Sequence, residues 1–120
     1  MINLQVDESY AFDFLSILEV KLMYANEKQE HAQKSFNFYS NLIAEQVGDS
    51  LFDEIRESVE YKKLKESNQI LFETIDNCKK YKMDAVIIDK LNYRRFQLKT
   101  ELQKKFFNKS TNEFKLGYSK

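Results

Sequence analysis

The sequence predicts an all-α fold, a compact antiparallel bundle of four or five helices joined by short connections. Apolar residues recur at three- and four-residue steps through most of the chain, which is the spacing of amphipathic helices. The 120 residues contain no proline and two glycines, too few for the turns of a β-sandwich or for a phosphate-binding loop. A chain of this length forms one domain around one core.

The N-terminal residues 1–6, called the arm below, have a strand-like pattern. Ile2, Leu4 and Val6 alternate with polar residues, so we expect a short strand or an extended arm. A single short strand is not stable alone in water. We therefore expect the arm to dock on another surface.

Residues 8–25 predict the central helix of the bundle. Asp7 or Ser9 can cap it, because either side chain can accept a hydrogen bond from a free amide of the first turn. A helix that is apolar on every side is normally surrounded by its neighbours. Here the apolar residues lie almost all the way round: Phe12, Phe14, Leu15, Ile17, Leu22 and Tyr24.

A second amphipathic helix is predicted to end at Gly48, the residue type that most often follows a helix C-terminus. The polar stretch 26–34 before it either turns the chain or forms an exposed helical turn. The apolar positions of this helix are Ala32, Phe36, Tyr39, Ile43 and Val47.

A third helical segment begins at residues 49–50, where Ser50 and Asp53 approximate a capping box. Its apolar stripe changes direction around Ser67 and Asn68. This drift predicts a kink or break near residues 62–68.

The last long helix can be capped by Asp84, and residues 109–120 are expected to form a tail. Apolar residues alternate at steps of three and four along one side of this helix, with one arginine among them. The positions are Ile88, Leu91, Arg95, Leu98, Leu102 and Phe106.

Charged residues inside the apolar patterns form the first candidate site. Asp13, Glu19 and Lys21 lie in the central helix, and Arg95 interrupts the apolar side of the last one. A guanidinium cannot deprotonate and needs acceptors, so we expect a buried or half-buried pair between Arg95 and either Asp13 or Glu19. The favoured interpretation is a pair that sets helix register; the alternative is a small-ligand site at Asp13, Glu19 and Arg95.

The sequence offers little support for a metal site or for a catalytic nucleophile. Glu27 and His31 share a helix face, but carboxylate di-metal bundles use Glu-x-x-His motifs on two helices, and the chain has one histidine. We expect no cofactor and no metal, and we infer no catalytic activity. One cysteine excludes an internal disulfide, and the absence of a signal peptide or a long apolar run suits a cytoplasmic protein that does not enter membranes.

The zero net charge hides a strong asymmetry. Residues 1–78 carry fifteen acidic and seven basic side chains, and residues 79–120 carry four acidic and twelve basic ones, a split of −8 and +8. Attraction between the two segments within one fold is the favoured reason. The alternative is nucleic-acid binding through phosphate contacts and base stacking. Its candidate residues are Lys90, Arg94, Lys99, Lys104 and Lys105.

Large apolar side chains exceed what one helix face can bury. Phe36, Phe38 and Tyr39 crowd one helix, and Phe106 and Phe107 end another. Exposed apolar patches usually mark interfaces. We therefore expect a protein that acts by association, as a homo-oligomer or as an accessory subunit of a larger assembly.

Residues 13–21 read Asp-Phe-Leu-Ser-Ile-Leu-Glu-Val-Lys. This segment resembles the motif Asp-Lys-x-(Thr/Ser)-Ile-Leu-Glu-Ile-Lys of a family of small bacterial and phage proteins of unknown function. Phe14 replaces the lysine of the motif. Residues 92–99, Asn-Tyr-Arg-Arg-Phe-Gln-Leu-Lys, resemble a second family motif, Asn-Asp-x-Arg-Ala-x-Leu-Lys. The resemblance implies an all-helical fold and supplies no activity.

Overall fold

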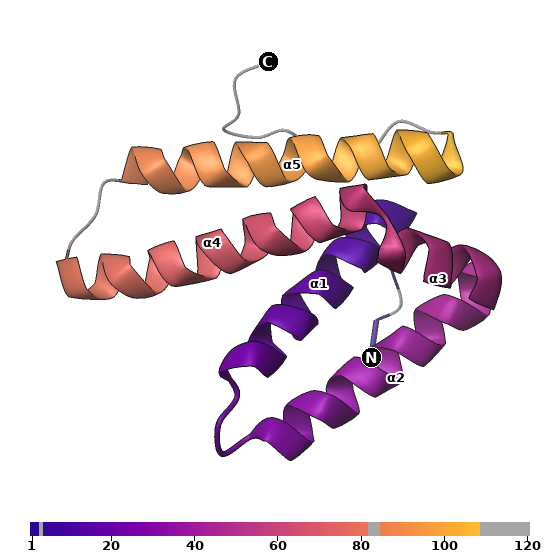
Figure 1. Cartoon of the computed structure of the whole chain (residues 1–120), viewed down its shortest axis with the longest axis horizontal. Helices are drawn as coiled ribbons and strands as arrows, with labels where there is room; N and C mark the ends of the chain where they lie inside the picture. Colours follow the sequence, from indigo (N-terminus) through magenta and orange to yellow (C-terminus); the bar gives the residue numbers. More distant parts are fainter. Residues whose placement is uncertain (3, 82–84, 109–120) are drawn as a thin grey trace.

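Five α-helices follow one another in the part of the chain that the computed structural model describes, residues 1–2, 4–81 and 85–108 (Figure 1). No β-strand occurs among these residues. The predicted all-α fold is therefore confirmed. The helices are α1 (Glu8–Tyr24), α2 (Gln29–Val47), α3 (Asp49–Glu57), α4 (Val59–Tyr81) and α5 (Ala85–Phe107).

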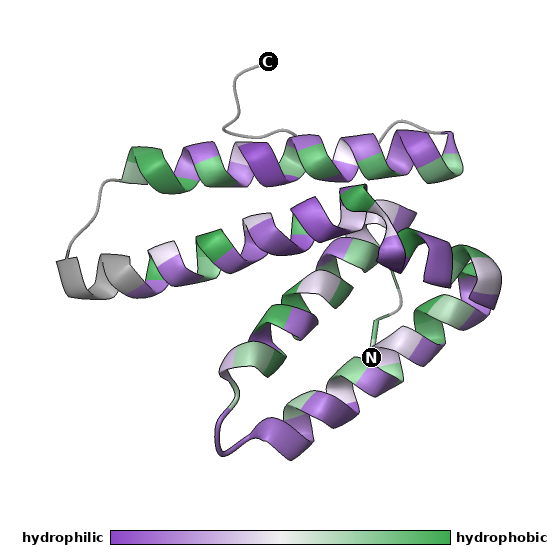
Figure 2. Ribbon diagram, in the orientation of Figure 1, coloured by the Kyte–Doolittle hydropathy of each residue, from purple (hydrophilic) through white to green (hydrophobic). Residues whose placement is uncertain are grey.

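Helix α1 contacts α2, α4 and α5, and α4 likewise contacts three helices. The prediction that neighbours surround α1 on every side is wrong, because Tyr10, Phe14 and Met23 are exposed. Helices α4 and α5 run antiparallel side by side, and the short α3 links the end of α2 to the start of α4 (Figure 1). Bands of apolar and polar residues alternate along every helix (Figure 2), as expected where each helix buries one side.

All five helices contribute to the core. Phe12 lies at its centre, with ring centroids 5.9 Å from Phe52, 6.3 Å from Tyr61 and 6.5 Å from Phe107. Phe106 also packs against this core. We expected Phe106 and Phe107 to exceed what the helix can bury, and this expectation is wrong, because both pack against the core. The buried apolar members are Phe12, Leu15, Ile43, Phe52, Ile55, Tyr61, Leu64, Leu98 and Leu102.

Gly48 ends α2 as predicted, and it also starts α3. Its φ of 94° and ψ of 141° lie in a region that is essentially restricted to glycine. Its N–H donates to Ala44 O at 2.9 Å, and its carbonyl accepts from Phe52 N at 2.9 Å. One residue therefore completes two helix ends. The expected capping box at Ser50 and Asp53 is wrong, because α3 already begins at Asp49 and its N-cap is Gly48.

The break predicted near residues 62–68 lies instead at Ser58. Its backbone is extended, its Oγ accepts from Tyr61 N at 3.1 Å, and its own N–H donates to Ile55 O at 3.0 Å. Helix α4 continues unbroken through 62–68. Ser67 and Asn68 are buried there, and Asn68 bonds to α1 rather than to its own backbone, so it does not interrupt the helix.

The polar stretch 26–34 forms a turn in its first part and the exposed start of a helix in its second, so both expected structures occur. A turn follows Ala25, and α2 then starts at Gln29 with exposed polar residues, His31 among them. The predicted cap at Asp84 and the tail at 109–120 lie outside the described residues. Among the described residues, no helix combines the length and the hydrophobicity that a membrane-spanning segment requires.

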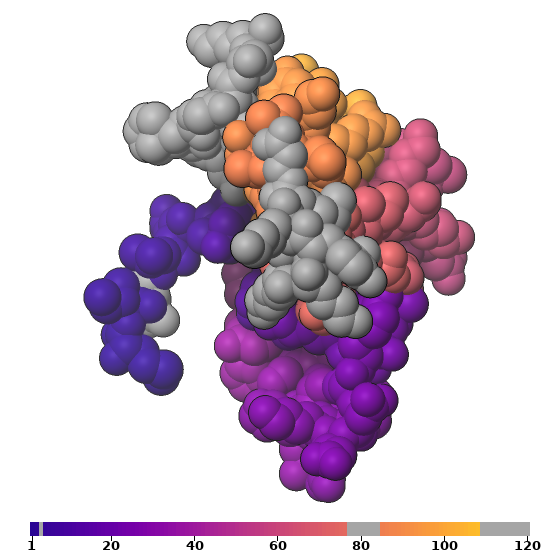
Figure 3. Space-filling model, turned by 90° about the vertical axis from the view of Figure 1, so that its left-hand side faces the viewer, coloured from indigo at the N-terminus to yellow at the C-terminus, as the bar shows by residue number. Residues whose placement is uncertain are grey.

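The arm projects from the body of the molecule (Figure 3). Ile2 is 86% exposed, Leu4 79% and Val6 52%. The described residues of one copy therefore leave most of these three side chains exposed, and the expected docking of the arm is not seen among them.

Candidate functional site

Asp13 is the centre of a polar cluster between α1, α4 and α5, and 2% of its side chain is exposed. Arg95 Nη2 lies 2.6 Å from Asp13 Oδ2, and Arg95 Nε lies 3.1 Å from both carboxylate oxygens. Asn68 Nδ2 donates to Asp13 Oδ1 at 2.8 Å and to Ser16 Oγ at 2.7 Å. Ser16 in turn donates to Asp13 O at 2.7 Å, within its own helix. The carboxylate is thus held by charged and neutral donors from two other helices.

Lys99 also faces this cluster. Its Nζ lies 3.9 Å from Asp13 Oδ2 and 5.7 Å from the centroid of the Tyr10 ring. Only 6% of Lys99 is exposed, so this residue lies inside the bundle and not on the surface that the alternative nucleic-acid prediction requires. A lysine on the inner side of α5 is tolerated because its ammonium group has both an anion and a ring face.

Glu19 forms a separate ion-pair cluster six residues, about 1.7 turns, further along α1. Its carboxylate accepts from Arg56, from the Tyr61 hydroxyl at 2.7 Å and from Lys65 Nζ at 3.1 Å. The Arg56 guanidinium lies 5.2 Å from the centroid of the Phe36 ring and 5.9 Å from that of Tyr61. This arrangement combines a salt bridge with cation–π contacts, for which arginine is better suited than lysine.

These contacts shift the ionisation of both Glu19 and Tyr61. Burial alone would raise the pKa of Glu19, but the donors Tyr61, Arg56 and Lys65 outweigh it and lower that pKa below 4.5. Burial and the neighbouring carboxylate raise the pKa of the Tyr61 hydroxyl. The cluster therefore favours an ionised Glu19 and a neutral, donating Tyr61.

The structure divides the predicted charged residues into two groups. Arg95 pairs with Asp13, whereas Glu19 pairs with Arg56 and Lys65. Lys21 is exposed and joins neither cluster of the described residues. Sequence analysis missed Arg56. The available signal was its position beside the apolar residues of α3, as one of a few arginines in a lysine-rich chain.

Neither ion-pair cluster lines either of two cavities whose walls consist of described residues. One cavity of about 280 Å³ lies between α4 and α5, lined by residues that include Ser67, Leu91 and Arg94, and the larger one described below lies between α1 and α2. Asp13, Glu19 and Arg95 line neither. Their closed packing supports a structural role, in which paired charges fix how the helices align.

The other basic residues of α5 that are candidates for nucleic-acid binding differ in their surroundings. Lys90, Arg94 and Lys104 are exposed, while Lys105 Nζ pairs with Glu60 at 2.8 Å. This pair joins the basic C-terminal segment to the acidic N-terminal one, as the charge split predicts. Nucleic-acid binding by the exposed cations stays a prediction.

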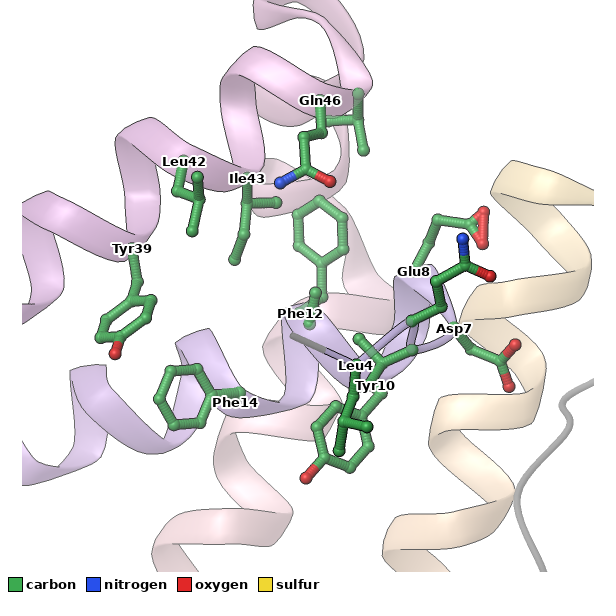
Figure 4. Close-up of a pocket in the computed structure, with 14 residues that line it drawn as sticks. Leu4, Asp7, Glu8, Tyr10, Phe12, Phe14, Tyr39, Leu42, Ile43 and Gln46 are labelled. Atoms are coloured by element: carbon green, nitrogen blue, oxygen red, sulfur yellow. The ribbon is translucent and has the colours of Figure 1, made fainter. Parts of the chain in front are cut away.

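The larger cavity is a groove of about 610 Å³ bounded by the arm, α1 and α2, called the α1–α2 groove below. Tyr39, Leu42 and Ile43 point from α2 toward α1 across it (Figure 4). The Phe14 ring meets the Tyr39 ring edge-on, with centroids 4.9 Å apart. Its lining also includes Leu4, Val6, Asp7, Glu8, Tyr10, Ala11, Phe12, Gln46 and Val47. The groove is thus largely apolar, with its acidic residues at the start of α1.

No group of three or more His, Cys, Asp or Glu side chains suited to hold a metal ion occurs among the described residues. The chain matches no protein-family model, and no curated protein or solved structure is significantly similar to it. The resemblance of residues 13–21 to the small bacterial and phage family stays a prediction.

Proposed function

We propose that this protein acts by protein–protein association, with a second copy of itself binding at the α1–α2 groove. The observation that carries the proposal is the groove itself, which is concave and largely apolar, lies on the outside of the bundle and has a volume of about 610 Å³. Concave, mostly apolar sites of this kind are where proteins bind ligands and partner segments.

Exposed aromatic rings extend the apolar surface beyond the groove. Phe38 is 62% exposed and its ring meets Tyr39 edge-on at 5.0 Å, while Tyr39 in turn meets Phe14. Aromatic side chains bury large areas and are enriched at the cores of interfaces. These three rings are the residues that a partner would cover.

The α2 wall of the groove supports a second copy as the partner. Its lining residues are Tyr39, Leu42, Ile43, Gln46 and Val47, and none is charged. In a two-fold symmetric dimer both copies contribute this surface to one interface, so like charges on it would lie close together and repel one another. An uncharged wall avoids this cost, and homodimer interfaces are more apolar than the rest of the protein surface.

Sedimentation velocity over a range of micromolar concentrations tests this function. The wild-type chain is expected to form a dimer, and Leu42→Asp, which places a charge on a partly exposed groove residue, is expected to shift the population to monomer. Ile87→Asp is the matched control, because Ile87 is equally apolar and 41% exposed but lies on α5 outside the groove. A wild-type chain that stays at 14.4 kDa throughout overturns self-association and leaves the accessory-subunit alternative.

A further inference from the structure

We infer that the segment that fills the α1–α2 groove is the arm of the partner copy, so that two chains exchange arms reciprocally. This inference rests on the proposed function and names the occupant of the groove. The exchange is a form of domain swapping, in which identical elements change places between two copies.

The arm has the pattern of a segment that is buried on one side. Ile2, Leu4 and Val6 lie at alternate positions, which point to the same side of an extended chain. In a single copy all three are more than half exposed. The arm itself contains no charged side chain, so it matches the uncharged α2 wall of the groove.

In one copy the arm bounds the groove without filling it. Leu4, Gln5 and Val6 form part of the lining, yet about 610 Å³ remains open between them and α2. A volume of this size lies in the range that accommodates drug-sized ligands, and it therefore has room for several side chains. The open space is lined mainly by apolar residues, and the exposed arm carries the apolar side chains Ile2, Leu4 and Val6, so the arm is suited to fill the space.

The extended arm is also longer than the groove wall that it would cover. Six extended residues span about 20 Å. The groove wall from Tyr39 to Val47 on α2 rises about 12 Å. An arm arriving from a second copy is thus long enough to cover the whole wall.

The arm can leave its own copy without loss of structure. The described arm residues, 1–2 and 4–6, contribute no hydrogen bond to the rest of the described chain. Asp7, at the hinge, has an extended backbone with φ −61° and ψ 149°. The start of α1 is held independently, because Gln103 accepts a hydrogen bond from Ser9 N–H.

A mixed cross-linking experiment tests the exchange. One full-length chain carries Leu4→Cys, a second with a different affinity tag carries Leu42→Cys, and both carry Cys78→Ser to remove the native thiol. Oxidation of the mixture is expected to give a disulfide-linked species containing both tags, abolished by reductant. Pairing Leu4→Cys with Ile87→Cys is the control, and it is expected to give at most a tenth of that product.

A second variant measures the arm's contribution to affinity. The double substitution Leu4→Asp/Val6→Asp changes exposed residues, so helicity by circular dichroism is expected to stay unchanged. The dimer dissociation constant is expected to rise at least about tenfold, because apolar burial is lost. A dimer that persists without a Leu4–Leu42 cross-link, or with an unchanged dissociation constant in the double variant, overturns arm exchange while self-association stands. A monomeric wild-type chain overturns both.

Discussion

The side chain of Gln103 completes the N-terminus of α1 from a position 94 residues away, because its Oε1 accepts a hydrogen bond from Ser9 N–H at 2.7 Å. Its Nε2 also donates to the Glu8 carboxylate at 3.2 Å. Asp7, the N-cap residue, forms no capping bond through its side chain. The last helix thus supplies the cap that a local residue usually provides. Because Ser9 lies in α1 and Gln103 in α5, this bond holds the start of α1 against α5.

Replacing Gln103 with leucine is expected to lower the free energy of unfolding by about 1–3 kcal/mol, because the buried Ser9 N–H loses its acceptor. Urea denaturation followed by circular dichroism measures the change. Gln97→Leu, at an exposed position of the same helix, is the control and is expected to change stability by less than about 0.5 kcal/mol. Equal effects of the two variants would contradict the capping role.

Replacing Arg95 with methionine is expected to cost about 3 kcal/mol, because it removes the main partner of the buried Asp13 carboxylate. Asn68 and Lys99 remain near that carboxylate, which keeps the loss at the lower end for a broken buried pair. The neighbouring variant Arg94→Met changes an exposed arginine and is expected to be nearly neutral. An Arg95→Met protein that is more stable than wild type would disprove the register role.

Stability is expected to fall at acidic pH through protonation of Glu19. The pKa of Glu19 is lowered in the folded chain, so the unfolded chain binds the proton more tightly. The stabilisation from this group is therefore present above pH 4.5, the ordinary value, and is lost as the pH falls through the lower folded pKa.

Urea titrations at neutral pH and below pH 4.5 measure this loss, and Glu19→Gln is expected to reduce its size. The same variant is expected to be about 1.5–3 kcal/mol less stable than wild type at neutral pH, because it loses hydrogen bonds to a charged acceptor. Glu54→Gln, at an exposed carboxylate of α3, serves as the control. An unchanged acid profile in Glu19→Gln would show that other groups govern the transition.

Replacing Gly48 with alanine is expected to destabilise the protein by about 1–3 kcal/mol through backbone strain. Steric overlap is not the cause, because a Cβ at this position meets no atom within 4 Å. Thermal unfolding measures the effect. Ser50→Ala, two residues further on, tests the rejected capping box and is expected to be neutral, because Ser50 lies inside α3.

Helix existence was predictable from the sequence because it depends on local information. The spacing of Phe36, Tyr39, Ile43 and Val47 shows α2 directly, and Gly48 marks its end. The position of the next break was less accessible. Nothing in the local sequence distinguishes Ser58 from the other polar residues of the region. Asn68 stays within a continuous helix because its side chain bonds to Asp13, which is 55 residues away in the sequence.

The sequence by itself determined the all-α class and the two carboxylates and one arginine that needed partners. The tertiary structure alone decided that Arg95 meets Asp13, that Arg56 meets Glu19, and that Lys99 points inward. Helical periodicity fixes the side of a helix on which a residue lies, but not which other helix faces that side. The pairings join residues 37 and 82 positions apart, so they exist only once the helices have packed.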